Sequence, residues 1–532
     1  MVKAEFLRRK KAKILCYIML VIVALFVSNE LGVCAEQTLV VGMFTEPSRL
    51  DGRSNSAAAH FLPCAVEFLI WPDYDLKFKP QLATSWVASP DGKKFTFLLR
   101  KGVKYHCGFP FNAEAVKLNL DGALGRLEGW SKSTESGMID LIDEVKVLDE
   151  YTVEVTLKEP SGVFLFNANA HYGVTSMICP SCLKKYGKDD FGIKYLCGTG
   201  PFKFGGWIRG SSVTFTGNKD YWNGAPKLEK IVYKIIKDEG ARTMALETGE
   251  IDLNMDLPSH EIDRLRKDPK IDVHLTESVR TLYLFINTKK EPTADRRVRQ
   301  AFGHAINIPE MVKHVVGDIG QPPTGCVASR VFGAHKDLAK LIPQYNPKKA
   351  KQLLSEAGWK DSGDGVLRKD GKPLQVTMIS MDHRTPKDRE VAEAIQSYLK
   401  KIGVECKMQI VEWAYFTTGL KNTSFDMYTY AWRAVTGDCD YPFGSLLKAG
   451  YRWNGTGYDN ARVQELITLG QREPDPKKRL QLYFELQKIS LEDAAWIPIF
   501  HENVSIGAQK YVKGFRVHPN GRPFFHKVSI EK

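Results

Sequence analysis

The sequence predicts an α/β protein with two lobes that are joined by crossing strands. The chain has 532 residues, which is more than one hydrophobic core normally organises. Strand, helix and strand patterns over 374–379, 387–401 and 404–411 form a βαβ unit, whose strands pair in parallel through a right-handed crossover. No Gly-, Ser- or Pro-rich linker divides the chain. A hinge of crossing strands is therefore expected.

The composition is that of an ordinary globular protein. Apolar residues make up 43% and charged residues 26% of the chain, which excludes a disordered, collagen-like or many-spanning membrane protein. Part of the net charge of +13 belongs to the basic N-terminus. No block of Lys and Arg elsewhere indicates a surface for nucleic acid, so no nucleic-acid partner is expected.

The N-terminus is typical of a secretory signal. A basic run over 8–13 precedes an unbroken apolar run over 14–27, and Ala35 offers a small residue for cleavage. The apolar run is shorter than the about 20 residues that a membrane-spanning helix needs. We therefore expect a signal peptide over 1–35 and a periplasmic or otherwise extracytoplasmic protein. Two alternatives stay open: residues 31–34 faintly resemble a lipoprotein box with Cys34 lipidated, and the signal could remain as an uncleaved anchor.

The cysteines that follow the signal lie in an oxidising compartment if the chain is exported. Cys179 and Cys182 form a CxxC motif with Cys197 close behind. A zinc site would need a second CxxC or a pair of histidines, and a redox site would need a helix N-terminus. Neither is recognised, so structural disulfides of unknown pairing are expected. The cysteines concerned are Cys64, Cys107, Cys179, Cys182, Cys197, Cys326, Cys406 and Cys439.

Other elements follow from periodicity and from helix-end signals. Asn112 and Asn346–Pro347 are typical of helix starts, and Gly249 and Gly358 of helix ends. The expected elements are strands over 39–44, 95–100, 425–432 and 496–500, a hairpin of 145–148 with 153–157, and helices over 112–124, 241–248, 347–357, 459–471 and 475–493.

Catalytic motifs are absent from the sequence. It has no phosphate-binding loop, no GxSxG elbow, no HExxH and no GxGxxG pattern. The run 361–365 has only a partial calcium-loop pattern, and a tight turn is the simpler interpretation. We therefore expect neither catalytic residues nor a cofactor, and a protein that is not an enzyme.

Several segments, taken in order, resemble one known family. They are Leu82–Trp86 with 89–92 and 95–100, 102–105 with 109–116, Gly198–Phe202, Asn218–Trp222, Leu246–Asp252, 287–288 with 298–301, Asn346–Trp359 and Trp496–Ile499. Together they are similar to the family 5 solute-binding proteins of ABC importers. Members of that family carry dipeptides, oligopeptides, glutathione or nickel complexes.

The resemblance implies a fold and a division into domains. The family fold is a two-lobed periplasmic-binding-protein clamp of the class II type, with an extra subdomain on the first lobe. The implied first lobe is discontinuous and consists of 36–55, 198–285 and 497–532. The extra subdomain covers 56–197, and the second lobe covers 286–496.

The resemblance also implies a function. The protein would capture a peptide-like solute outside the cytoplasmic membrane and deliver it to a membrane ABC permease with its ATPase subunits, and it would act as a monomer. A different class, an exported hydrolase or a chaperone-like protein, is the remaining alternative. The absence of a nucleophile–base motif disfavours the hydrolase.

The family's ligand segment corresponds to 432–442. In peptide-binding relatives an aspartate of this segment pairs with the ligand ammonium, because a buried ammonium needs a charged partner. Either Asp438 or Asp440 fits that role, and Arg433 fits a ligand carboxylate.

Further candidate residues would complete the cleft. Aromatic side chains could form its flat walls, and a Gly-Thr-Gly reversal could turn backbone amides toward it. These candidates are Trp413, Tyr415, Trp432, Tyr441, Gly198, Thr199 and Gly200.

The nickel branch of the family is a weaker alternative. Residues 287–293 resemble it, and His60 falls near a position where that branch has a metal ligand. However, Ser176 stands where the branch has an arginine for the carboxylates of its chelator, and 451–459 holds no histidine. We therefore expect no metal site, with His60 as the only candidate ligand.

Overall fold

The computed structural model describes residues 37–532 except 52–55, 134–138, 169–174, 382–384, 386 and 423. The expected signal peptide, with Cys34, lies outside the described residues. Within the described ranges, no helix combines the length and the apolar character that crossing a membrane requires.

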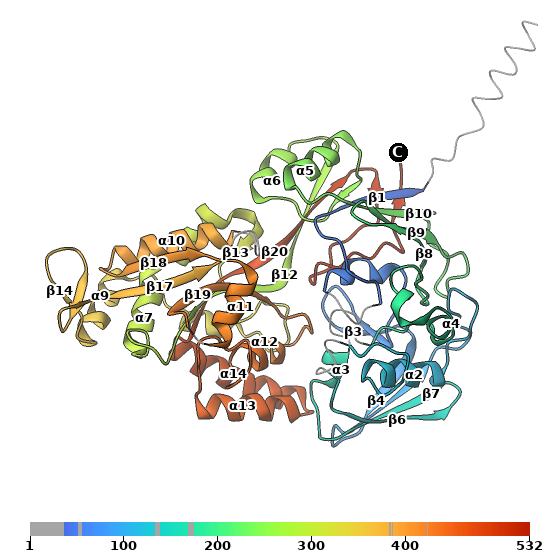
Figure 1. Ribbon diagram of the computed structural model, residues 1–532, viewed down its shortest axis with the longest axis horizontal. Coiled ribbons are helices and arrows are strands. Elements are labelled where there is room, and N and C mark those ends of the chain that lie inside the picture. Colours follow the sequence, from blue (N-terminus) through green and yellow to red (C-terminus); the bar gives the residue numbers. More distant parts are fainter. Residues whose placement is uncertain are drawn as a thin grey trace, which may run out of the picture.

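One mixed sheet runs through both lobes (Figure 1). Its strands follow the order β18-β17-β19-β12-β20-β11-β1-β10-β9-β8, and β13 pairs with β20. Their bounds are β1 (Thr38–Met43), β8 (Phe202–Ile208), β9 (Ser212–Gly217), β10 (Lys230–Ile235), β11 (Leu253–Asn254), β12 (Ile271–Ile286), β13 (Gly320–Gln321), β17 (Gln375–Ser380), β18 (Glu405–Ile410), β19 (Met427–Arg433) and β20 (Trp496–Gln509).

Helices cover this sheet in each lobe. The first lobe has α5 (Glu239–Thr248) and α6 (Ser259–Leu265). The second lobe has α7 (Arg296–Ala305), α8 (Ile308–Met311), α9 (Pro347–Glu356), α10 (Asp388–Lys400), α11 (Trp413–Lys421), α12 (Asp440–Leu446), α13 (Ala461–Arg472) and α14 (Pro476–Glu492). Short elements complete it: η5 (Val312–Val316), η6 (Gly317–Ile319), η7 (Lys336–Leu341), β14 (Lys360–Asp361), β15 (Leu367–Lys369) and β16 (Lys372–Pro373).

A separate four-stranded sheet, in the order β4-β5-β7-β6, forms the extra subdomain. Its bounds are β4 (Ala83–Ala88), β5 (Lys94–Leu99), β6 (Ile142–Asp149) and β7 (Thr152–Leu157), with α2 (Ala113–Ala123), α3 (Phe164–Ala168) and α4 (Pro180–Asp190). The segment before this sheet holds η1 (Ser56–His60), η2 (Leu62–Cys64), β2 (Ile70–Pro72) and β3 (Phe78–Pro80), and the C-terminus holds β21 (Val512–Lys513) and β22 (Ser529–Ile530).

The long strands β12 and β20 connect the two lobes. The first half of β12 pairs with β20 alone, and its second half, from Arg280, also pairs with β19 of the second lobe. The register between β12 and β20 shifts between Glu277 and Thr281 and again after Leu282. Such bulges bend a strand and increase its twist. The bend lies before the lobe boundary at 285 that the family resemblance implies.

Local signals in the sequence account for many elements. The side chain of Asn112 accepts a hydrogen bond from the Ala115 N–H at the start of α2, and Asn346 does the same for α9. The parallel pairing of β17 with β18 across α10 confirms the expected βαβ unit. One expectation was wrong: Cys179 is the N-cap of α4, so the CxxC motif does lie at a helix start.

Candidate functional site

A cavity of about 1000 Å³ lies between the lobes. Its volume is at the upper end of the range of about 300–1,000 Å³ that small-molecule sites show. Phe44, His60 and Arg522 approach it from the first lobe, and β19 and α12 approach it from the second. Among the described lining residues, six are Arg or Lys and two are acidic. The cavity therefore favours a ligand that carries negative charge.

Aromatic rings form one wall. The rings of Tyr430 and Trp453 are nearly parallel with centroids 6.3 Å apart, and Trp413 and Trp432 lie 5.8 and 5.4 Å from Trp453. Tyr441 lies 5.6 Å from Trp432. The structure thus brings the predicted Trp413, Trp432 and Tyr441 together at the cavity.

The predicted set of aromatic cavity residues included one residue that does not line the cavity and omitted two that do. Tyr415 is 58% exposed and is not among the cavity residues. Tyr430 and Trp453 do line the cavity. Tyr430 precedes Trp432 by two residues on β19, so strand alternation alone places both side chains on the same face.

The basic end of the cavity is built around Arg433 and Arg522. Arg433 Nη1 donates to the Asn520 carbonyl oxygen at 3.1 Å, and its Nη2 lies 4.0 Å from Glu502, whose nearer partner is Arg280 at 3.0 Å. Within the described part of the chain, Arg433 Nε and Arg522 Nη2 are buried without a hydrogen-bond partner. A buried donor without an acceptor is costly.

Burial and repulsion between neighbouring cations lower the pKa values of both arginines. Burial, together with the charge of Arg280, lowers the pKa of Arg433 to about 10. Burial, together with the charge of Arg433, lowers the pKa of Arg522 to about 9. Both guanidinium groups stay charged near neutral pH, and an anion between them would relieve both effects.

His60 lies beside the three arginines. Burial first, and then the charges of Arg433, Arg522 and Arg280, lower its pKa to about 3. The imidazole is therefore neutral at physiological pH. The structure places His60 in the cavity wall, where a neutral ring can accept a hydrogen bond or bind a metal ion.

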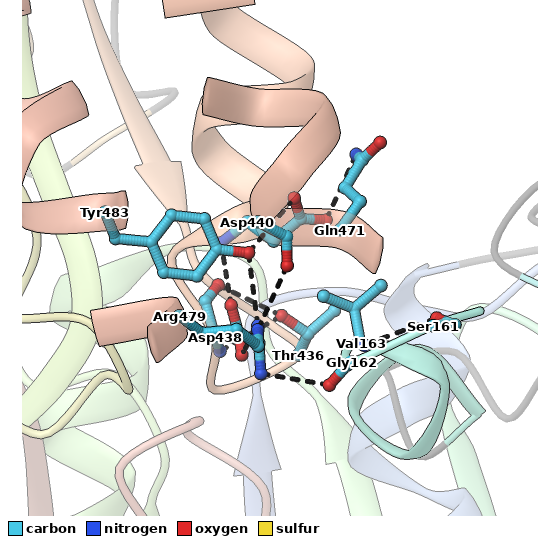
Figure 2. Close-up of polar contacts among 10 residues, drawn as sticks. Ser161, Gly162, Val163, Thr436, Asp438, Asp440, Gln471, Arg479 and Tyr483 are labelled. Atoms are coloured by element: carbon cyan, nitrogen blue, oxygen red, sulfur yellow. Dashed lines mark hydrogen bonds and ion pairs between the residues drawn. The ribbon is translucent and has the colours of Figure 1, made fainter. Parts of the chain in front are cut away.

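Asp438, one of the two predicted carboxylates, is enclosed by protein groups (Figure 2). Its Oδ2 accepts from Arg479 Nη2 at 2.6 Å, and its Oδ1 accepts from the Asp440 N–H at 2.8 Å. Both members of the ion pair are almost fully buried. Asp438 is not among the cavity residues. Its carboxylate therefore has protein partners on both oxygens.

Asp440 occupies the cavity wall in front of Asp438. Within the described ranges, its side-chain oxygens accept only long hydrogen bonds, from Gln471 Nε2 at 3.4 Å and from the Tyr483 hydroxyl at 3.5 Å. Burial, and then the charge of Asp438, raises the pKa of Asp440 to about 7. Asp440 can therefore change its charge near neutral pH.

The Gly-Thr-Gly reversal does not belong to this cavity. Gly198, Thr199 and Gly200 are absent from its described wall. The Gly200 N–H donates to the Ala65 carbonyl oxygen at 3.0 Å, and a Cβ at Gly200 would come within 2.7 Å of the Ala65 carbonyl carbon. The glycines allow close packing of two segments, and the expectation that this reversal faces the cleft is corrected accordingly.

Contacts between the lobes surround the cavity. We call three of them the interlobe latch: the Gly162 N–H donates to the Gln471 carbonyl oxygen at 2.9 Å, Arg479 Nη1 donates to the Gly162 carbonyl oxygen at 2.9 Å, and Arg472 pairs with Glu159. The loop 159–163 belongs to the extra subdomain, and its partners belong to α13 and α14. The structure is therefore that of a clamp with its lobes in contact.

Two lobes that share one sheet and enclose a charged, aromatic cavity define a solute-binding clamp. Comparison with known families agrees. The family described as bacterial extracellular solute-binding proteins, family 5, middle region, matches residues 77–454. The chain belongs to this family.

The chain is also similar to individual proteins whose ligands are known from their names or structures. The chain is 29% identical over 470 residues to the glutathione-binding protein GsiB of Escherichia coli, covering 86% of this chain and 87% of the relative. NikA from Brucella suis, solved in complex with Fe(III)-EDTA, is 26% identical with a TM-score of 0.84, over 93% of this chain and all of that chain. AppA of Bacillus subtilis, an oligopeptide-binding protein solved with a nonapeptide, is 26% identical with a TM-score of 0.75 over the same shares.

Proposed function

We propose that the protein captures a peptide-like solute with at least one carboxylate outside the cytoplasmic membrane. It then delivers the solute to an ABC permease with its ATPase subunits, and it performs no chemistry on the solute. The named functions of GsiB and AppA support a peptide-like ligand. Export rests on the signal expected over 1–35, with lipidation at Cys34 as the alternative.

The observation that carries this proposal is the pair of guanidinium groups of Arg522, which is buried, and Arg433, which is half-buried. Each leaves one nitrogen without a partner within the described residues. A guanidinium fork matches a carboxylate in geometry and charge. A ligand carboxylate placed between them would satisfy both orphan donors and offset their repulsion.

Asp440 is the proposed partner of an ammonium group on the same ligand. A ligand ammonium beside it would favour the ionised carboxylate and lower its pKa from about 7. Asp438 holds the Asp440 backbone through the 2.8 Å bond to its N–H. In this arrangement Asp440 contacts the ligand and Asp438 is a positioning residue. The aromatic wall would pack against the body of the ligand.

Closure of the clamp supplies the mechanism. A ligand that contacts both lobes binds the closed state more tightly than the open state, so it shifts the population toward closure. The interlobe latch stabilises the closed state through contacts between protein groups, although Glu159, Gln471 and Arg472 also line the cavity. We place the hinge for this closure in the bulged segment of β12 and β20.

A carboxylate-bearing metal chelate is the second candidate. Its support is the neutral His60 in the cavity wall beside three arginines. The same arginines could hold the carboxylates of a chelator while His60 approaches the metal. The likeness to NikA, solved with Fe(III)-EDTA, agrees with this alternative.

The test begins with native mass spectrometry of the mature protein, before and after unfolding, to identify a ligand that co-purifies. Calorimetric titrations then compare glutathione and small peptides with the same molecules amidated at their carboxyl ends. We expect the amides to bind at least about tenfold more weakly, because a charge-assisted hydrogen bond is lost. Equal binding of acid and amide would contradict the proposal. Release of a metal chelate would select the second candidate.

A further inference from the structure

Four cysteine side chains converge in the extra subdomain. The Sγ atoms of Cys107, Cys179, Cys182 and Cys197 all lie within 4.8 Å of one another. Three of the four residues are buried and Cys107 is exposed. None of them is among the residues that line the interlobe cavity. The proposed capture of a solute therefore makes no use of them.

We propose that these four thiolates bind one tetrahedral divalent cation, for which Zn²⁺ is the best-fitting ion. Thiolates about 2.3 Å from a shared zinc ion, at tetrahedral angles, lie about 3.8 Å from one another. The Cys107 and Cys179 sulfur atoms are 3.4 Å apart, and no pair of the four exceeds 4.8 Å. An iron–sulfur cluster divides its thiolates among several iron atoms, which requires a wider spacing.

The backbone holds the ligands in place from three separate segments. Cys179 is the N-cap of α4, and Cys182 lies in its first turn. The Cys179 N–H donates to the Cys197 carbonyl oxygen at 2.8 Å, and the His106 N–H donates to the Gly198 carbonyl oxygen at 2.8 Å. These bonds fix the segments of Cys107 and Cys197 relative to the CxxC motif. The site is therefore built by the fold rather than by chance approach of flexible side chains.

Polar groups directed at sulfur favour a thiolate. The Ser181 hydroxyl lies 3.1 Å from Cys179 Sγ, within hydrogen-bond distance. Interactions of this kind orient metal ligands and tune them. Tyr105 is buried and interacts with Cys107, Cys179 and Cys197, so it covers one side of the cluster, and the exposed Cys107 leaves an entry path.

The spacing of the four cysteines explains why sequence patterns alone did not predict this zinc site. A zinc site was expected to need a second CxxC motif or a pair of histidines, but here the other two ligands come singly from Cys107 and Cys197. All eight described cysteines are free thiols, so the structure also differs from the expected disulfides. A cation here would join the distant segment of Cys107 to the segments of the CxxC motif and Cys197, and it would stabilise the subdomain.

The experiment uses the full mature chain, purified without an immobilised-metal column. Elemental analysis and a thiol count after unfolding establish the state of the protein as isolated. A Co²⁺ titration of the reduced, metal-free chain then reports tetrahedral thiolate ligation by its intense visible absorption. We expect one zinc ion per chain as isolated, retained through gel filtration, and one equivalent of Co²⁺ bound with a thiolate spectrum.

Matched variants assign the ligands. Cys182→Ser should lower the zinc content to less than a tenth of the wild-type value, whereas Cys406→Ser, which changes a buried cysteine outside the cluster, should leave it unchanged. If Cys182→Ser does not fold, the Co²⁺ spectrum of the wild-type chain decides. Two disulfides among the four cysteines in the isolated protein would overturn the proposal, as would zinc retained by Cys182→Ser or a reduced chain without a cobalt–thiolate spectrum.

Discussion

Charges of opposite sign lie at and beside the cavity, with Arg433 and Arg522 in its wall and Asp438 behind it, and they differ in how their hydrogen bonds are satisfied. Asp438 has protein partners on both carboxylate oxygens. Arg433 and Arg522 each keep a donor without a partner within the described residues. The difference separates two roles. A buried charge with complete partners supports the fold, and a buried charge with incomplete partners is available to a ligand.

The largest expected effect concerns Asp438, whose two carboxylate oxygens both have protein partners. Asp438→Asn leaves the almost fully buried Arg479 without its counter-ion, so the free energy of unfolding should fall by about 3–5 kcal/mol. Denaturant titration of the unliganded protein measures this. The exposed Asp220 offers a control, since Asp220→Asn should change stability by less than about 0.5 kcal/mol. A variant Asp438→Asn as stable as that control would refute the structural role.

Substitution of Arg433 should have the opposite effect: it should weaken ligand binding without lowering the stability of the unliganded protein. Arg433→Gln should weaken binding of a carboxylate ligand by about 30-fold or more, because a buried charge-assisted contact is lost. The melting temperature of the unliganded protein should not fall, since the change also removes repulsion with Arg280. Calorimetry and thermal melts report the two quantities. Arg452 lies on the exposed rim of the cavity, and Arg452→Gln should alter affinity by less than about threefold.

A smaller effect is expected at the interlobe latch. A Cβ at Gly162 would overlap the Glu473 carbonyl oxygen, so Gly162→Ala should disfavour closure by about 1–3 kcal/mol. Affinity should fall by about tenfold, although Gly162 is not among the cavity residues. Gly240→Ala in α5, where the nearest atom is 3.4 Å away, is the matched control. Unchanged affinity in Gly162→Ala would argue against the latch.

The smallest effect is a pH dependence at Asp440. Its pKa is raised to about 7 in the folded protein, above the value of an unfolded chain. The folded state therefore binds the proton more tightly, and stability is lost as pH rises from about 4 through 7. Asp440→Asn should raise the melting temperature at pH 8 and leave it almost unchanged at pH 4. The same shift at both pH values would contradict the assignment.

Local signals made much of the fold predictable. Asn112, Asn346 and Gly249 mark helix ends through interactions within a few residues, and the βαβ unit follows from short-range periodicity. The resemblance to a family then supplied the clamp that local patterns could not. The start of α4 was missed because Cys179 caps the helix without the side-chain hydrogen bond that Asn, Asp or Ser would make.

The site was predictable only where its residues are close in sequence. Trp432, Arg433, Asp440 and Tyr441 share one segment that the resemblance marks. The distinction between Asp438 and Asp440 depends on Arg479, which comes from another helix. Arg522 lies in an irregular C-terminal segment with no motif. Partners that only the tertiary fold brings together leave no local pattern.

The position of β20 in the sheet has a consequence for how the protein is made. This strand, near the C-terminus, lies between β11 and β12, and β1 at the other end of the described chain pairs with β11. The central sheet therefore cannot assemble until residues 496–509 have been synthesised. Contacts between such distant segments form slowly. If the chain is exported as proposed, the late arrival of β20 keeps the nascent chain incompletely folded, which is the condition in which it can still be threaded through a translocation pore.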